Sequence, residues 1–257
     1  MSEMDTNQTQ LNKKGISGST LKIIAMVTML IDHIGAVVLE VGYMPYLLQN
    51  GETMLYEQWA TVDTWMRLLG RMAFPIFCFL LVEGFHYTKS VPKYLGRLLL
   101  FALISEVPFD LAICKTTLSF AHQNVYFTLF FGLLAIALYD RVNSAKCNYG
   151  NMKKRILSVI AVVGCGILAV LCHTDYDMAG VLLIVVLYMF RNIEPVRNFA
   201  ASIAMLGAGL VEIAGYIAFI PMHFYNGERG LKLKYIFYIF YPLHLLLLVY
   251  IRTIICN

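Results

Sequence analysis

The stretch 21–41, LKIIAMVTMLIDHIGAVVLEV, decides the fold class, because it is apolar over nearly its whole length. A helix needs about 20 such residues to cross a hydrocarbon core of about 30 Å. The polar segment before it, residues 1–20, has no apolar region followed by a small-residue cleavage site. We therefore expect residues 21–41 to form a membrane-spanning helix that also acts as an uncleaved signal anchor.

The rest of the chain has a similar composition. Of its 257 residues, 59% are hydrophobic and 14% are charged, and the mean hydropathy is +0.68. A soluble globular chain carries about 25% charged residues, so this chain has too little polar surface to cover itself in water. We predict an all-α, polytopic membrane helical bundle, with a polar cytoplasmic segment at 1–20 and one membrane domain at 21–257. The expected helices, about eight, cover residues 21–41, 65–85, 94–113, 125–139, 156–172, 178–190, 199–220 and 235–254.

Positive charge orients the expected helices. With the N-terminus in the cytoplasm, most of the 20 Lys and Arg residues fall on the cytoplasmic side, as the positive-inside rule requires. An even number of crossings then puts both termini on that side. One loop breaks the rule, because Arg229, Lys232 and Lys234 fall between the last two expected helices, on the opposite side. Either the larger number of basic residues on the cytoplasmic side sets the orientation despite these few charges, or these few residues bind an anion.

Two other features exclude function classes. The six cysteines form no C-x-x-C pair, so we expect neither a metal site nor a disulfide framework. The net charge is only +4, and no basic patch with interleaved aromatic residues is present, so we expect no nucleic-acid partner.

Ionisable side chains recur inside the expected helices, where each costs about 2.5–3.5 kcal/mol at a helix centre. Arg67 and Arg71 are four residues apart and share a helix face, as do Glu106 and Asp110. These two pairs could simply neutralise each other across neighbouring helices. The direction of each helix, however, puts most of the polar residues in one layer, from mid-membrane to the outer interface, and we expect them to line one cavity. The members of this layer are Asp32, His33, Arg67, Arg71, Glu106, Asp110, Gln123, Asn124, Asp175, Asp177 and His244, with Arg229 and Lys232 in the outer loop.

The residue types in this layer favour group transfer. A histidine beside a carboxylate suits general base catalysis. Asp32 and His33 point about 100° apart on a helix, so Glu106 or Asp110 is a better carboxylate partner for His33. Paired arginines suit phosphate binding, because the guanidinium fork matches phosphate oxygens. A base with a phosphate clamp indicates a phosphorylated or coenzyme A donor, although proton-coupled transporters bury the same groups.

Short motifs along nearly the whole chain resemble the TraX family of membrane proteins, named for the acetylation of conjugative F-pilin. The match is loose only between about residues 141 and 198. The motifs are LKIIA (21–25), IDHIG (31–35), GRMAFPIF (70–77), EGF (83–85), YLGRL (94–98), SEVPFDL (105–111), QNVYFTL (123–129), NGERG (226–230) and YIFYPLH (238–244).

The resemblance implies a multi-pass protein of the bacterial inner membrane that moves an acetyl group from acetyl-CoA to an amine or hydroxyl acceptor. Acetyl-CoA is then a co-substrate, and no tightly bound cofactor or metal is expected. His33 corresponds to the histidine that related membrane acyltransferases use on an early helix; it either deprotonates the acceptor or carries the acetyl group. The predicted catalytic residues are His33, Asp32, Glu106 and Asp110. The predicted donor- and substrate-binding residues are Arg67, Arg71, Asn124, Asp177, Arg229, Lys232, His244 and Tyr241.

Two other function classes fit the same sequence. A small-molecule or ion transporter would use the same polar cavity, and a non-catalytic assembly factor for a conjugative or surface structure would need no active site. Inverted repeats would favour a transporter, and the sequence has no convincing repeat.

Overall fold

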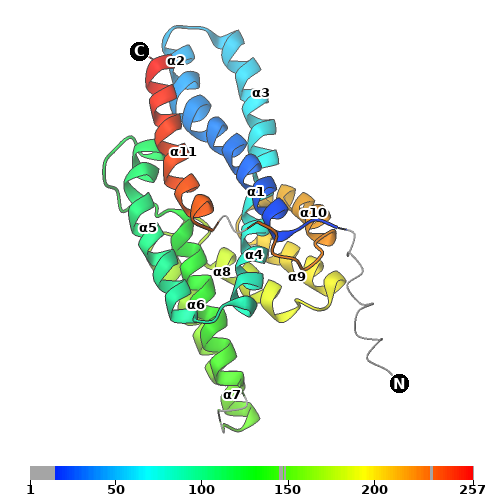
Figure 1. Cartoon of the computed structure of the whole chain (residues 1–257). Helices are drawn as coiled ribbons and strands as arrows, with labels where there is room; N and C mark the ends of the chain where they lie inside the picture. The colour runs from blue at the N-terminus through cyan, green and yellow to red at the C-terminus, as the bar shows by residue number, and fades with distance from the viewer. Residues whose placement is uncertain (1–14, 145–146, 148, 232–233, 257) are drawn as a thin grey trace.

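A computed structural model of the whole chain describes residues 15–144, 147, 149–231 and 234–256 (Figure 1). Every regular element in these residues is a helix, which confirms the predicted fold class. Lys232 and residues 1–14 of the predicted N-terminal segment lie outside the described residues. The elements are α1 (Gly18–His33), η1 (Ile34–Tyr43, a π-helix), α2 (Met44–Gln49), α3 (Thr53–Gly70), α4 (Ala73–Tyr87), α5 (Val91–Ile113), α6 (Val125–Asn143), α7 (Asn151–Leu171), α8 (Asp177–Met189), α9 (Glu194–Leu206), η2 (Leu210–Ala218, a 3-10 helix), α10 (Phe219–His223) and α11 (Lys234–Ile255).

Two long helical runs form an antiparallel hairpin at the start of the chain. The run α1–η1–α2 has 32 residues and the run α3–α4 has 35. Glycines let the two runs approach closely: a Cβ at Gly70 would meet Asp32, and one at Gly35 would meet side chains of α3. The second helical run begins at Thr53, whereas the sequence predicted that it begins at residue 65. Its polar first turns resemble a loop in the sequence, but they pack against η1.

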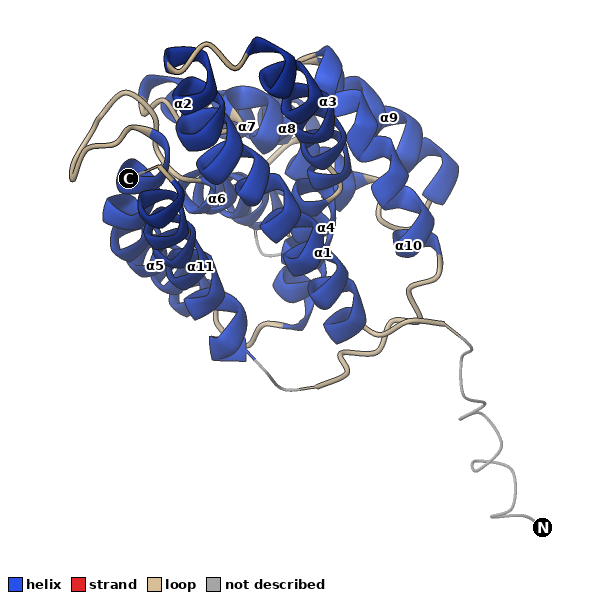
Figure 2. Ribbon diagram, turned by 90° about the horizontal axis from the view of Figure 1, so that it is seen from above, coloured by secondary structure: helices blue, strands red, loops and turns tan. Residues whose placement is uncertain are grey.

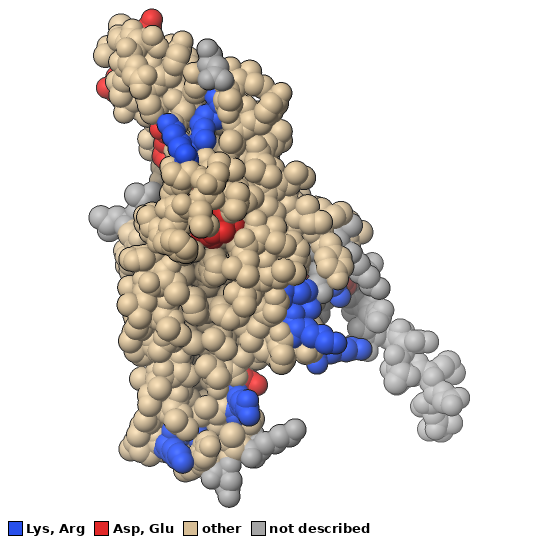
Figure 3. Space-filling view, turned by 90° about the vertical axis from the view of Figure 1, so that its left-hand side faces the viewer, with Lys and Arg blue, Asp and Glu red and all other residues tan. Residues whose placement is uncertain are grey.

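Five helical runs among the described residues are long and apolar enough to cross a membrane. A helical membrane protein is thus confirmed, whereas the number eight is not. Figure 3 shows a broad face without charged side chains, with Lys, Arg, Asp and Glu confined to a few groups. The five runs are Gly18–Gln49, Thr53–Tyr87, Val125–Asn143, Asn151–Leu171 and Tyr235–Ile255.

The predicted seventh helix, 199–220, is not one helix. The chain turns after α9, where Gly209 has a φ of +139°, a region that favours glycine. It then returns through η2 and α10, and His223 Nδ1 lies 2.8 Å from Glu194 Oε1. Residues 194–223 therefore form a helical hairpin whose first and last residues lie side by side. The two glycines at 207 and 209 are the sequence signal for this turn.

The hairpin reverses the predicted topology of the C-terminal helix. Three contacts in order show that α11 runs parallel to α1–η1: the Lys22 ammonium lies 5.0 Å above the Phe237 ring, His33 meets His244, and Arg252 packs on Gly42. If both helices cross the bilayer, the first residues of α1 and the last residues of α11 lie on opposite sides, as their positions in Figure 1 also indicate. The sequence predicted an antiparallel last helix, so this direction is a correction, whereas the cytoplasmic location of the two termini stays a prediction.

Helices α6, α7 and α8 form a second group, and α5 lies along α11 (Figure 2). Close contact of α6 and α8 depends on Gly132 and Gly180, since a Cβ there would meet Ile184 or Thr128. Helix α6 begins at the Asn124 cap, whose amide reaches the Ala102 carbonyl partway along α5. The start of α6 therefore lies beside the middle of α5, next to Glu106.

Candidate functional site

Charged residues of α1, η1, α3 and η2 form one group, which we call the charged cluster: Asp32, Glu40, Asp63, Arg67, Arg71 and Glu212. Arg67 Nη1 lies 2.7 Å from Asp32 Oδ2, and Arg67 Nε lies 3.3 Å from Glu40 Oε1. Arg71 Nη1 lies 2.7 Å from Glu212 Oε1, and Arg71 Nη2 lies 3.6 Å from Asp32 Oδ1. Both arginines are thus neutralised by carboxylates, but not by Glu106 or Asp110.

Three members of this cluster were not predicted as site residues. Glu40 lies at the end of the expected helix 21–41 and Asp63 lies before the expected helix 65–85, yet in the structure both lie well within helical runs, and Asp63 is buried. The signal was present, because residues 63, 67 and 71 share one helix face. Glu212 was a single carboxylate in the apolar run 210–220, which by itself marks a functional or paired position in a membrane protein.

Glu106, Asp110 and Asn124 form a separate buried group. Asn124 Nδ2 donates to Glu106 Oε2 at 2.5 Å, and the Ser119 amide donates to Asp110 Oδ2 at 2.6 Å. The Asn124 side chain also caps α6, because its Oδ1 accepts from the Tyr126 amide at 3.1 Å. Among the described residues, neither carboxylate contacts His33, which was the partnership expected from the sequence.

His33 pairs with His244 instead. Its Nδ1 lies 2.6 Å from His244 Nε2, and the planes of the two rings differ by 19°, with their centroids 4.9 Å apart. The Tyr241 ring packs edge-on against both, at 5.9 Å from His33 and 5.7 Å from His244. His244 is buried and His33 only half-buried. In the described part of the chain, His33 Nδ1 is hydrogen-bonded and His33 Nε2 has no hydrogen-bond partner.

A cavity of about 340 Å³ lies beside the charged cluster, and we call it the Arg71 cavity. Its polar walls come from Arg71, Asp175, Asp177 and Glu212. Desolvation by the surrounding chain raises the pKa of Asp175 to about 7, although Arg71 opposes this. Of the residues predicted to be catalytic or to bind donor or substrate, only Arg71 and Asp177 line this cavity, and Asp175 was predicted only as a member of the polar layer. The full lining is Arg71, Val170, Asp175, Tyr176, Asp177, Met178, Ala179, Gly207, Ala208 and Glu212.

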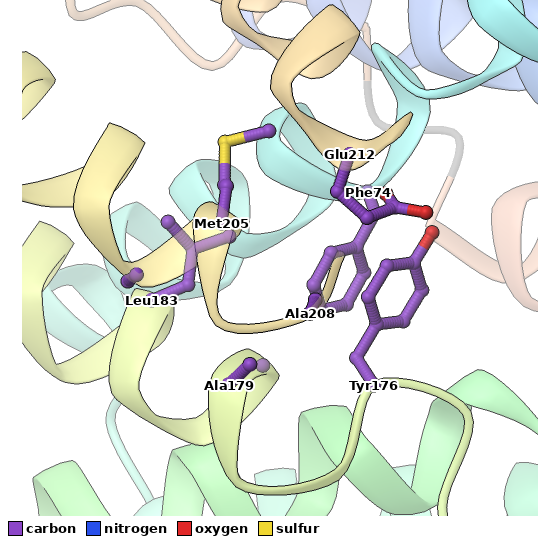
Figure 4. Close-up of a pocket in the computed structure, with 9 residues that line it drawn as sticks. Phe74, Tyr176, Ala179, Leu183, Met205, Ala208 and Glu212 are labelled. Atoms are coloured by element: carbon purple, nitrogen blue, oxygen red, sulfur yellow. The ribbon is translucent and has the colours of Figure 1, made fainter. Parts of the chain in front are cut away.

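A smaller apolar recess adjoins this cavity and shares Tyr176 and Glu212 with it. Figure 4 shows the Tyr176 hydroxyl and the Glu212 carboxylate directed to the same side, with Met205 and Leu183 across the recess. The Tyr176 ring stacks on Phe74, with centroids 3.6 Å apart. This stack fixes the start of α8 against the GRMAFPIF motif of α4.

Arg229 does not join this site. The Ser19 amide donates to the Arg229 carbonyl at 3.1 Å, and this places Arg229 at the start of α1. Lys22 and Arg97 also lie where α1 and α5 begin, and we call Lys22, Arg97 and Arg229 the basic cluster. No carboxylate lies within ion-pair distance of these three in the described ranges. The loop that broke the positive-inside rule therefore lies beside the first residues of α1.

Comparisons with known proteins agree with the resemblance in the motifs. The family model described as TraX protein matches residues 17–252. A protein of Dichelobacter nodosus described as "Probable fimbrial assembly protein FimC, serogroup H1" is 28% identical over 259 residues, which cover 90% of this chain and 94% of the relative. No solved structure matches.

Proposed function

Since the chain belongs to the TraX family, we propose that it is a membrane-embedded acyltransferase that moves an acetyl group from acetyl-CoA to an amine or hydroxyl acceptor, with His33 as its base. The observation that carries the proposal is the free Nε2 of a half-buried histidine, held by a second histidine near the charged cluster. General bases in enzymes are most often histidines whose other nitrogen is held by a fixed partner.

The proposed reaction is direct transfer. The acceptor nitrogen or oxygen attacks the thioester carbonyl carbon while His33 Nε2 takes the acceptor's proton. The carbon–sulfur bond then breaks, and coenzyme A leaves with its sulfur protonated by the His33 imidazolium. The proton therefore moves from acceptor to leaving group, and His33 returns to its neutral form.

The charge of the Arg71 cavity favours an amine as the acceptor. Asp175, Asp177 and Glu212 outnumber Arg71 there, and Arg71 is already paired with Glu212. Such a wall attracts an ammonium group and repels the phosphates of coenzyme A. The volume of about 340 Å³ is at the lower end of the range of small-ligand sites, about 300–1,000 Å³. We propose that the terminal amine of a peptide or another small amine binds in this cavity as an ammonium group and first gives one proton to water, because only the neutral amine has the lone pair that attacks the thioester.

The donor phosphates then need another site, and we propose the basic cluster. Lys22 and Arg229 lie at the start of α1 with no carboxylate partner among the described residues. If the N-terminus is cytoplasmic, this end faces the compartment that supplies acetyl-CoA. Arg67 and Arg71, predicted as the phosphate clamp, would instead orient Asp32 and the adjacent His33.

The test is transfer from labelled acetyl-CoA by the purified full-length protein in lipid nanodiscs, with a panel of peptide amines and sugars. We expect label on an amine acceptor, and a fall in rate of about 10²–10⁴ in His33→Ala. His122→Ala is the matched control, because His122 is exposed on a loop. A folded His33→Ala protein that transfers acetyl at the wild-type rate would overturn the assignment.

One observation favours a second candidate. The printed name of the Dichelobacter nodosus relative describes a fimbrial assembly protein, with no reference to catalysis. A non-catalytic assembly factor would support surface-fibre formation in cells even when it carries His33→Ala. An acetyltransferase would lose any modification of its acceptor in the same cells, so one variant separates the two functions.

A further inference from the structure

The hydrogen bonds of the histidine pair end at a backbone carbonyl. His244 Nδ1 lies 2.7 Å from the Phe240 carbonyl oxygen, one helical turn earlier in α11. A carbonyl only accepts hydrogen bonds, so His244 Nδ1 carries the proton and donates. In the neutral imidazole the other nitrogen, Nε2, is then an acceptor.

The same reasoning fixes the proton on His33. His244 Nε2 accepts, so the hydrogen bond of 2.6 Å to His33 Nδ1 requires a proton on His33 Nδ1. Neutral His33 therefore carries its lone pair on Nε2. Free imidazole side chains in water favour the opposite form, with the proton on Nε2, so the protein must impose this one.

The surroundings hold His244 in the required orientation. Its ring stacks on Phe240, with centroids 4.7 Å apart, and meets the edge of Tyr241. The sequence suggests a different role for His244, which is to bond a backbone carbonyl left unpaired near it. Pro242 lacks the N–H that would pair with the Tyr238 carbonyl. That carbonyl accepts from the Tyr126 hydroxyl at 3.3 Å, which leaves the His244 ring free to hold His33.

We propose that His244 is a positioning residue that selects the His33 tautomer with the proton on Nδ1, so that Nε2 is the reactive nitrogen. The catalytic meaning of this inference rests on the proposed acyltransferase function, whereas the tautomer itself does not. When His33 Nε2 takes a proton, the imidazolium still donates from Nδ1 to neutral His244. The pair thus resembles the histidine and its orienting partner in hydrolase triads, with a neutral ring in place of the carboxylate.

The test has a readout that needs no substrate. The full-length protein, with ¹⁵N-labelled histidine, is placed in nanodiscs, and the His33 nitrogens are assigned by their loss in His33→Asn. At neutral pH the wild type should show a protonated Nδ1 and a bare Nε2. His244→Phe keeps the aromatic contacts but removes the acceptor, and should move the His33 proton to Nε2. His244→Gln offers an amide oxygen near the place of His244 Nε2, and should keep the proton on Nδ1.

Two results would overturn the inference: a wild-type His33 protonated on Nε2, or the same His33 spectrum in wild type and His244→Phe. The exposed His122 provides the control signal that should not change in any variant. If His244→Phe does not fold, the wild-type spectrum and His244→Gln decide the question.

Acetyl transfer separates this inference from the proposed function. With transfer established, His244→Phe should lower kcat by about 10²–10⁴ with little change in the KM for acetyl-CoA, and His244→Gln should stay within about tenfold. If the spectra are as expected but the wild type transfers no acetyl group, the tautomer stands and the acyltransferase fails. If transfer occurs but the tautomer is not altered in His244→Phe, the positioning role fails and the acyltransferase stands.

Discussion

The charged cluster and the basic cluster both contain arginine, but they differ in their partners. In the charged cluster, Arg67 and Arg71 each contact two carboxylates, and the Asp32 and Glu212 side chains there are at most 16% exposed. In the basic cluster, Lys22 and Arg229 have no carboxylate within ion-pair distance in the part of the chain that the structure describes. Cations that are already neutralised orient other groups, whereas unneutralised cations can bind an anionic ligand.

The largest expected effect is an all-or-none difference in thiol labelling. It tests on which face of the membrane the two ends of α1 lie. In a background without the native cysteines, Glu228→Cys should react with an impermeant thiol reagent from the same face as an N-terminal epitope tag. Glu57→Cys, at the start of α3, should react only from the opposite face, because α3–α4 runs antiparallel to α1. Labelling of both positions from one face would contradict the parallel arrangement of α1 and α11.

The second effect concerns the stability of the charged cluster. Asp32→Ala leaves both arginines short of a partner in a poorly solvated place, and should lower the free energy of unfolding by about 3 kcal/mol. Thermal unfolding in detergent measures this loss. Glu40→Gln is the control, because Glu40 is 43% exposed and its pair should contribute less than about 1 kcal/mol. An Asp32→Ala protein as stable as Glu40→Gln would show that the cluster is solvated.

The third effect concerns the helix approach that assembles the charged cluster. A Cβ at Gly70 would meet the Asp32 side chain, so Gly70→Ala should push α1 and α3 apart at a cost of about 1–3 kcal/mol. Gly164→Ala is the matched control in α7, where a new Cβ has open space and should be neutral or stabilising. Equal unfolding temperatures for the two variants would mean that the close approach does not constrain the site.

The smallest effect concerns the basic cluster. Lys22→Gln with Arg229→Gln should raise the KM for acetyl-CoA about tenfold, or about 1.4 kcal/mol, with kcat nearly unchanged, because the interaction is equally strong in ground and transition states. Lys89→Gln, an exposed lysine before α5, is the control. Should Arg71→Gln raise the KM for acetyl-CoA while the double variant does not, the donor site would belong to the charged cluster.

The sequence predicted helix positions better than helix directions. Apolar length located the elements around 21–41, 94–113 and 235–254, since burial in lipid depends mainly on the side chains within one helix. The direction of α11 depended on whether 199–220 crosses or turns back. Hydropathy is the same in both cases, and only the turn at Gly209 distinguishes them.

The site shows the same division. Intramembrane polarity singled out Asp32, His33 and His244 as candidate site residues, because an ionisable group in an apolar run is costly. The partner of His33 was predicted to be Glu106 or Asp110, and in the structure it is His244. A sequence cannot provide this pairing, since it depends on the rotation and register of α1 against α11.

By itself, the sequence determined that this protein is a helical membrane protein of the TraX family with a histidine and charged residues inside its bundle, because composition and motifs are local properties. The tertiary structure decided which charges neutralise each other, that Lys22 and Arg229 lie together at the start of α1, and which nitrogen of His33 is free among the described residues. All three outcomes depend on distances of about 3 Å between side chains on helices that are far apart in the sequence. Close helix contacts, such as that of Gly70 with Asp32, set these distances.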